Sequence, residues 1–213
     1  MLFLYIINIT MEICSVKEKY IQYLQKFDNK VCLTKLNKPF GRKYVGIVFE
    51  IKDFTYFAPL SSSVYKIING EKVFKKHFTD VYLFNGKASI GSIKINNMIP
   101  IPRKIEDKLL EPLIFDEFTS SKDISIVQYG NLLKNQRVAI NTEEKKQEIL
   151  DKATSFYKTY KFNPKLQQLC CDFQLLEQKA LEFSLDIFKD LNKEFKLEKK
   201  KEKVNDLEEE LVR

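Results

Sequence analysis

Apolar residues alternate along the first half of the chain and recur with a helical period along the second half. In residues 44–51 (YVGIVFEI) every second side chain from Val45 onward is apolar, which predicts a strand. Residues 54–60 (FTYFAPL) return as a second strand after a Lys-Asp turn. Asn69-Gly70 and Asn85-Gly86 each lie between short apolar runs and predict hairpin turns. The first half therefore predicts an antiparallel sheet.

A helical period appears first in residues 17–27, after a short strand at 12–16, and residues 28–43 are polar enough to predict a loop. The proline-rich segment 98–102 ends the β-rich half, because proline does not serve a central strand. Helices are predicted further on, at 121–135, 142–160 and 165–190. The expected fold class is α+β: a partly open, strongly curled antiparallel sheet followed by a helical half.

One domain with two appended ends accounts for the length of 213 residues. Residues 1–10 are expected to lie outside the core as an N-terminal extension. Residues 11–188 form the domain, β-rich over 12–104 and helical over 105–188. Residues 189–213 contain 16 charged side chains among 25 and predict a charged helical tail.

Composition excludes several classes of function. The chain has only 6 glycines and contains neither G-x-G nor a P-loop motif, so the usual phosphate-binding loops are absent. It has one histidine and no C-x-x-C pair among its 4 cysteines, which excludes a histidine-rich metal site and a zinc ribbon. We expect no metal and no cofactor. The longest apolar run, Leu2–Ile7, is too short to cross a membrane, and the chain is expected to be cytoplasmic.

Positive charge is concentrated in the β-rich half. Residues 12–104 carry 17 Lys/Arg and 7 Asp/Glu, a net charge of +10, whereas residues 105–188 have a net charge of −3. A basic half-domain favours a polyanionic partner, most often a nucleic acid. The alternative is a lysine-rich surface that is simply solvated.

Four segments together resemble a known family. They read R-K-Y-V-G-I-V-F-E (42–50), Y-F-A-P-L-S-S (56–62), I-G-S-I-K-I-N-N-M-I-P-I (90–101) and C-D-F-Q-L-L-E-Q-K (171–179). On these motifs, residues 11–183 resemble the ToxN/AbiQ family (including CptN-like toxins), the endoribonuclease toxins of type III toxin–antitoxin and abortive-infection systems.

The resemblance implies a fold similar to the MazF/Kid toxins, a partly open SH3-like barrel with added helices. It also implies metal-independent RNA cleavage. The expected partners are substrate RNA and a cognate antitoxin RNA, a small repeated RNA that folds as a pseudoknot and closes with the toxin into a ring-like assembly.

Catalytic positions follow from the same resemblance. Tyr20 matches the active-site tyrosine of the family, and Arg42 matches the basic residue before the Y-V-G strand, with Lys43 as an adjacent substitute. Ser61 and Ser62 match the hydroxyl pair after A-P-L, and Ser62 is the serine expected to be essential.

The family often continues with a lysine soon after that serine. Here that lysine is either absent or displaced to Lys66, which we include among the catalytic candidates.

Such residues suit cleavage in which the 2′-OH of the RNA is the nucleophile. The protein must align that oxygen, neutralise charge on the phosphorane and manage two protons. Hydroxyl groups and cations at a rigid strand end can do this. Without the family, however, Ser61 and Ser62 could belong to a polar loop, Tyr20 could be a core residue and Arg42-Lys43 could be an exposed pair.

Five further residues are candidates for RNA binding: Lys17, Lys19, Lys75, Lys76 and His77. Histidine in general can gain or lose a proton near neutral pH, so for His77 a role as general base stays open beside RNA contact and plain surface exposure. Two other functions also stay open: a basic barrel that binds RNA or DNA without cutting it, and a type II toxin inhibited by a protein.

Overall fold

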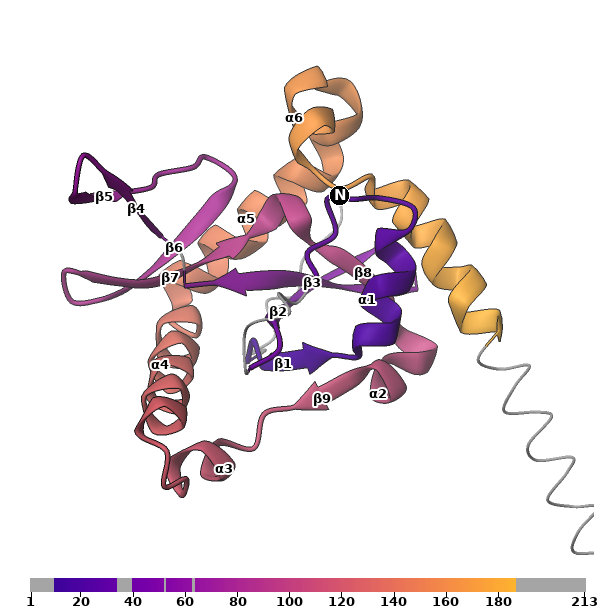
Figure 1. Cartoon of the computed structure of the whole chain (residues 1–213). Coiled ribbons are helices and arrows are strands. Elements are labelled where there is room, and N and C mark those ends of the chain that lie inside the picture. Colours follow the sequence, from indigo (N-terminus) through magenta and orange to yellow (C-terminus); the bar gives the residue numbers. More distant parts are fainter. Residues whose placement is uncertain (1–9, 34–39, 52, 63, 187–213) are drawn as a thin grey trace, which may run out of the picture.

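A computed structural model describes residues 10–33, 40–51, 53–62 and 64–186 (Figure 1). The expected N-terminal extension, except Thr10, and the expected charged tail lie outside the described residues. The elements are β1 (Ile13–Val16), α1 (Glu18–Gln25), β2 (Lys43–Ile51), β3 (Phe54–Ser61), β4 (Tyr65–Ile68), β5 (Glu71–Phe74), β6 (Asp80–Asn85), β7 (Ala88–Lys94), η1 (Ile95–Asn97), β8 (Ile99–Pro102), η2 (Arg103–Ile105), α2 (Glu106–Leu109), β9 (Leu110–Pro112), α3 (Phe115–Thr119), α4 (Ile124–Ile140), α5 (Glu143–Thr159), η3 (Tyr160–Phe162), α6 (Pro164–Leu169) and a last helix over residues 173–186.

Strand β3 is the centre of the main sheet. One of its edges pairs with β2, while the other edge is shared, Phe54–Phe57 with β8 and Leu60–Ser61 with β7. The full order is β6-β7-β3-β2-β1-β9, with β8 beside β3, and every pairing is antiparallel. Strands β4 and β5 form a separate two-stranded sheet.

The α+β class is confirmed, but the expected strongly curled, barrel-like sheet is wrong. In the described residues β6 and β9 are the two ends of the strand order and do not pair with each other, so the sheet is neither closed nor strongly curled. Strand β9 has three residues and ends at Pro112, which has no N–H to offer another strand. Helices pack against the sheet instead, α4 on β6 and β7 and α5 on β2.

Both Asn-Gly signals mark hairpin turns, as predicted. Asn69 and Gly70 join β4 to β5 with φ angles of +51° and +83°, and Gly86, with φ of +58°, joins β6 to β7. Asparagine and glycine are the residues that most easily adopt positive φ, so the sequence fixes these turns locally.

Most of segment 98–102 is strand β8 (Ile99–Pro102). Its two prolines are tolerated because β8 pairs with β3 on one side only within the described residues. The β-rich half nevertheless does not end there. Strand β9 follows and pairs with β1, so the helical half begins later than expected.

The helix predicted over 165–190 is interrupted at Cys170–Asp172. There the Cys171 N–H donates to the Asn96 carbonyl at 2.8 Å, and the Asp172 N–H donates to Oδ2 of Asp28 at 2.7 Å. Oδ1 of Asp172 then accepts from the Leu175 N–H at 3.1 Å and caps the last helix. Tertiary partners therefore replace the helical hydrogen bonds at this break.

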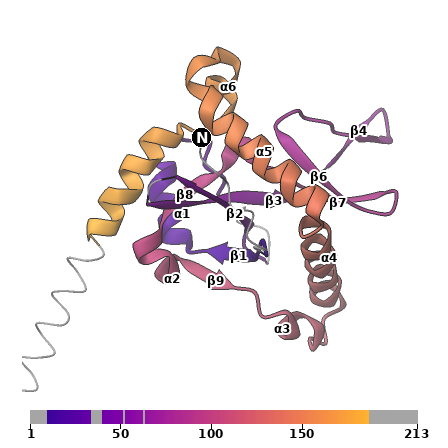
Figure 2. The same ribbon diagram turned by 180° about the vertical axis from the view of Figure 1, so that it is seen from behind.

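The last helix lies beside α1, as the two opposite views show (Figures 1 and 2). Tyr20 of α1 meets Phe183 edge to face, with the ring centroids 5.0 Å apart. Across the described residues, no helix combines the length and the apolar character that a membrane crossing requires.

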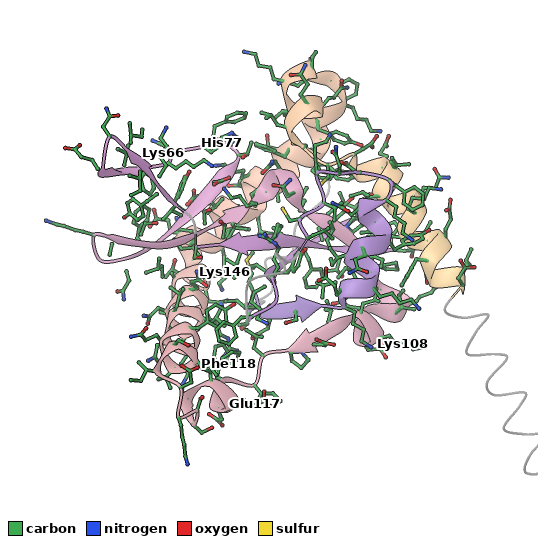
Figure 3. The ribbon with its side chains drawn as sticks, viewed as in Figure 1. Lys66, His77, Lys108, Glu117, Phe118 and Lys146 are labelled. Atoms are coloured by element: carbon green, nitrogen blue, oxygen red, sulfur yellow. The ribbon has the colours of Figure 1, made fainter. Side chains whose placement is uncertain are left out.

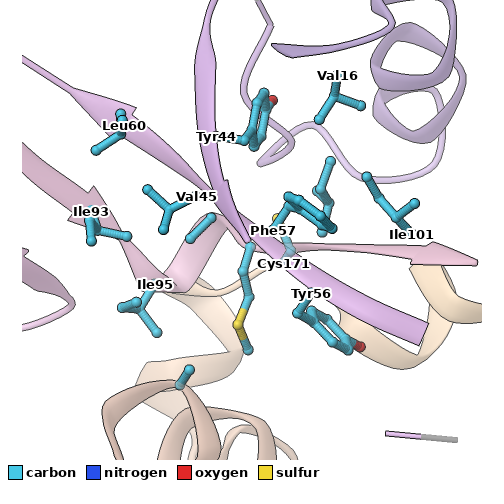
Figure 4. Packing of buried hydrophobic residues seen from close by; sticks show 14 of the residues in the cluster. Val16, Tyr44, Val45, Tyr56, Phe57, Leu60, Ile93, Ile95, Ile101 and Cys171 are labelled. Carbon is cyan, nitrogen blue, oxygen red and sulfur yellow. The ribbon is translucent and has the colours of Figure 1, made fainter. Parts of the chain in front are cut away.

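Three tyrosine rings are fully buried in the core, and each hydroxyl finds an acceptor. Tyr20 donates to the Pro100 carbonyl at 2.5 Å and Tyr44 donates to the Cys32 carbonyl at 3.0 Å. Figure 4 shows Tyr44 and Tyr56 among the aliphatic side chains of the sheet.

Tyr56 donates to Oε1 of Glu177 at 2.7 Å, and Tyr157 donates to the same oxygen at 2.7 Å. Glu177 is only 6% exposed. This carboxylate joins β3, α5 and the last helix, so its hydrogen bonds tie the two halves of the chain together.

Replacing Glu177 by leucine should lower the free energy of unfolding by about 2 kcal/mol or more, because the buried Tyr56 hydroxyl loses its acceptor. Glu177→Gln keeps an oxygen acceptor and should cost less. Urea unfolding of the two variants checks this, and an equal or higher stability of the leucine variant would contradict it.

Candidate active site

Predicted catalytic residues meet at the end of β3. Ser61 is the last residue of the strand and pairs with Ser92 of β7. Ser61 is half-buried and Ser62 is exposed. The Ser62 carbonyl accepts a hydrogen bond from the Val64 N–H at 3.1 Å, so the chain turns directly after the strand. The turn presents the Ser62 side chain to solvent at the strand end.

Arg42 is anchored beside this strand end. Its Nη1 donates to the Leu60 carbonyl at 3.4 Å and its Nε donates to the Leu33 carbonyl at 3.3 Å. Leu60 is the residue immediately before Ser61. The structure therefore places the guanidinium of Arg42 against the backbone of the residue that precedes Ser61.

Lys43 is held elsewhere, although it is the next residue. Its Nζ donates to Oγ of Ser15 on β1 at 2.7 Å, and burial lowers its pKa. Successive side chains of a strand point to opposite faces. The structure thus separates Lys43 from Arg42, and Lys43 does not stand in for it at the strand end.

A buried carboxylate lies next to the strand end. Asp80 is 4% exposed, and its Oδ2 accepts from Oγ of Ser92 at 3.2 Å and from Nζ of Lys94. Its Oδ1 accepts from Oγ1 of Thr79 at 3.2 Å, and its backbone carbonyl accepts from Nζ of Lys152 at 2.7 Å. The network fixes β6 and β7 beside Ser61.

Sequence reasoning missed Asp80, Ser92 and Lys94 as part of this site. A signal was present, because Ser92 and Lys94 alternate with Ile93 and Ile95, which are buried. Polar residues on the inner face of such a strand require buried partners.

Lys75, Lys76 and His77 lie near the same strand end. The Lys75 N–H donates to the carbonyl of Val64 at 2.7 Å. Val64 is only two residues after Ser62, so this hydrogen bond brings the basic segment close to the strand end. Lys75 and Lys76 are exposed and His77 is half-buried.

The imidazole of His77 is held in place from two sides. Its Nδ1 lies 2.6 Å from Oγ1 of Thr79, and the ring stacks on Phe78 with centroids 5.4 Å apart. The backbone N–H of His77 donates to the Tyr82 hydroxyl at 2.6 Å. The basic segment therefore has a defined conformation.

Lys66 lies on β4 and is exposed (Figure 3). Lys17 and Lys19 are exposed as well, but they lie at the start of α1, where the Lys17 N–H donates to the Leu109 carbonyl at 2.9 Å. Figures 1 and 2 place α1 and the β4–β5 hairpin on opposite sides of the molecule. The five predicted RNA-binding residues thus fall into two separate groups.

Tyr20 is not brought to the strand end either. Its side chain is fully buried, and burial raises the pKa of its hydroxyl well above the usual value. Its hydrogen bond to Pro100 and its contact with Phe183 give it a role in packing. The alternative interpretation of Tyr20 as a core residue agrees with this placement.

Hydroxyls and cations are thus the reactive groups at this strand end. Burial raises the pKa of Cys14 to about 12 and that of Cys170 to about 11, so neither thiol is a nucleophile near neutral pH. The described residues contain no group of three or more His, Cys, Asp or Glu side chains that could hold a metal ion.

A family model described as the toxin ToxN of type III toxin–antitoxin systems matches residues 12–181. The chain belongs to the ToxN family. Two relatives of known activity agree. The endoribonuclease ToxN of Bacillus thuringiensis subsp. kurstaki is 32% identical over 79% of this chain and 82% of its own length. The endoribonuclease AbiQ of Lactococcus lactis subsp. lactis is 34% identical over 84% of this chain and 92% of its own length.

Solved structures show the same ToxN-family fold. A type III toxin described as selectively inhibited by a non-coding RNA pseudoknot has a TM-score of 0.68 and 29% identity, covering 83% of this chain and 99% of its own. AbiQ, described as a lactococcal anti-phage endoribonuclease, has a TM-score of 0.61 and 26% identity, and the match covers 82% of this chain and 98% of the AbiQ chain. The resemblance inferred from the four motifs is confirmed.

Gly91 explains one of the ToxN-family motifs, I-G-S-I-K. Its φ is +150°, and a Cβ at this position would lie 2.9 Å from the Ser61 carbonyl oxygen and 2.5 Å from Nε2 of Gln136. Gln136 is 3% exposed and donates to the Ile90 carbonyl at 2.7 Å. Strand β3 and helix α4 both approach the glycine, so the position of Ser61 depends on it.

Gly91→Ala should therefore displace Ser61, lower stability and abolish growth inhibition on expression. Gly86→Ala is the control: its φ is also positive, but no atom lies within 4 Å of the added Cβ, so only a backbone cost of about 1–2 kcal/mol is expected. Urea unfolding and growth assays on both variants decide this. Equal effects of the two substitutions would show that the close approach to Ser61 is unimportant.

Proposed function

We propose that the protein is an endoribonuclease toxin of a type III toxin–antitoxin system that cleaves RNA without a metal ion and leaves a 2′,3′-cyclic phosphate. The observation that carries the mechanism is the end of β3, where the guanidinium of Arg42 is anchored on the Leu60 carbonyl, directly before Ser61 and Ser62. The family and the named activities of its relatives support the reaction class.

In this reaction the 2′-oxygen of a nucleotide forms a bond to the adjacent phosphorus, and the bond from phosphorus to the 5′-oxygen breaks. The 2′-OH loses its proton and the leaving 5′-oxygen gains one. Positioning of the phosphate and neutralisation of its charge are the contributions that this site can make.

Ser62 is the group proposed to hold the scissile phosphate, since it is exposed at a fixed turn. Arg42 supplies positive charge for the phosphorane, and one well-placed donor of this kind is worth about 3–4 kcal/mol. Lys66 follows Ser62 after four residues and is proposed as the second cation. Ser61 supports the turn from inside the sheet through its pairing with Ser92.

The inhibitor is proposed to be a cognate repeated RNA that folds as a pseudoknot and closes with the toxin into a ring-like assembly in the cytoplasm. A related toxin is described as inhibited by such a pseudoknot. The net charge of +10 in residues 12–104 supports a polyanionic partner of this size.

Cleavage should proceed in excess EDTA, and Ser62→Ala should reduce it by at least about 100-fold, the range seen when one transition-state donor is removed. Ser155→Ala, an exposed serine on α5, is the matched control and should cleave like the unchanged protein. Mass spectrometry of the products should find a 2′,3′-cyclic phosphate. A strict need for Mg²⁺ or a 3′-hydroxyl product would exclude the mechanism.

Binding of the cognate RNA should weaken with salt. Neutralising about six phosphates gives a log–log slope of about −4, from roughly −0.7 per phosphate of single-stranded RNA. The double variant Lys75→Glu/Lys76→Glu should flatten this slope and weaken binding. Lys158→Glu/Lys161→Glu, the same charge change at exposed residues of the helical half, should do so less.

Affinity measured across a salt series tests this expectation. An affinity that does not depend on salt, or a protein inhibitor that purifies with the toxin in place of RNA, would exclude the proposed partner.

A further inference from the structure

The β4–β5 hairpin extends from the candidate active site. It begins at Tyr65, three residues after Ser62, and returns at Lys75, whose N–H closes the base by donating to the Val64 carbonyl at 2.7 Å. In the described residues its two strands pair with each other and not with the main sheet. Figure 1 shows the hairpin standing out beside β6 and β7, on the side of the molecule away from α1.

Apolar side chains are exposed along this hairpin. Ile67 is 69% exposed, Ile68 is 41% exposed and Val73 is 36% exposed. A two-stranded hairpin is marginally stable in water when it stands by itself. Exposed apolar side chains on such an element therefore indicate a surface that another molecule covers.

Aromatic rings gather at the base of the hairpin. Phe74 lies 5.6 Å from Tyr65, 4.8 Å from Tyr82 and 6.3 Å from Phe84, measured between ring centroids. The Tyr82 hydroxyl donates to the Lys75 carbonyl at 2.5 Å and so holds the base of the hairpin on β6. Phe84 is 46% exposed, so this cluster presents a ring to solvent from a fixed support.

The charge of the hairpin identifies the chemistry of the molecule that covers it. Residues 65–76 contain four lysines and a single acidic residue, Glu71. A surface that combines cations with accessible rings and apolar side chains fits an unpaired polynucleotide, whose bases stack and whose phosphates need neutralising. A neutral protein surface would not require this charge.

We propose that the hairpin and the exposed ring of Phe84 hold single-stranded substrate RNA next to the bond that is cut. This inference rests on the proposed function and assigns its substrate-binding surface. We favour substrate over inhibitor because the hairpin begins three residues after Ser62, the residue proposed to hold the scissile phosphate. An RNA strand whose phosphate lies on Ser62 therefore continues onto the hairpin.

Phe84→Leu tests the proposal, since it keeps an apolar side chain but removes the ring. Phe162→Leu is the matched control, because Phe162 is 84% exposed on η3, away from the hairpin. The probe is a fluorescent 15-nucleotide RNA that spans a mapped cut and carries a 2′-O-methyl group at the attacking nucleotide. Fluorescence anisotropy of the full-length protein gives its Kd.

The Kd of the probe should rise at least about 5-fold for Phe84→Leu, the lower end for losing one stacked base, and stay unchanged for Phe162→Leu. Phe84→Tyr, which keeps a ring, should restore binding. Ile67→Asn, at the most exposed hairpin position, provides a second variant if Phe84→Leu lowers the melting temperature.

Equal affinities of the Phe84 and Phe162 variants would overturn the proposal. So would a loss confined to the folded inhibitor RNA, which would assign the surface to the antitoxin. If the unchanged protein cuts no RNA, the proposed function fails. The unmodified 15-nucleotide RNA then still tests whether the hairpin binds a single strand.

Discussion

The hydrogen-bonding edges of β3 are the constraint on which the rest of the structure depends. A strand has two edges, and here one edge serves β2 while the other must serve both β7 and β8. Because β7 and β8 are consecutive in the chain, the path between them has to bend, and η1 provides the bend. The two halves of β3 are thereby held by different strands. Its first half is in the core, and its last residues are left at an open end.

Electrostatics reinforces this arrangement. A carboxylate as buried as that of Asp80 is costly unless it is paired and hydrogen-bonded. Lys94, Ser92 and Thr79 supply those partners, and they come from β7 and from the turn that precedes β6. The same interactions that satisfy the buried charge also hold these segments rigidly beside Ser61. Rigid support of this kind is what a site needs when it acts by positioning.

Local signals in the sequence predicted the elements well. The Asn-Gly turns and the alternation in 44–51 both act within a few residues, and the structure agrees with them. The curled sheet was predicted wrongly because closure depends on which distant edges pair, and no local pattern encodes this.

The candidate site shows the same division. Arg42, Ser61 and Ser62 were proposed from motifs, and the structure anchors Arg42 on the Leu60 carbonyl, directly before the two serines. Asp80 was missed, since its role depends on burial by partners from other strands. The motif comparison predicted Tyr20 as an active-site residue, but in the structure its side chain lies on the buried face of α1, in the core.

Hydrogen bonds between the β-rich half and the helical half determine when the native fold can form during synthesis. The side chain of Asn141 hydrogen-bonds both the N–H and the carbonyl of Met11, 130 positions away. The carboxylate of Asp28 accepts a hydrogen bond from the backbone N–H of Asp172, 144 positions away. The β-rich half leaves the ribosome first, yet these polar groups lack their native partners until the helical half follows. Contacts of such long range form late. The core is therefore completed only after the segment around Asp172 has been synthesised, so a chain that stops before it lacks contacts on which the native fold depends.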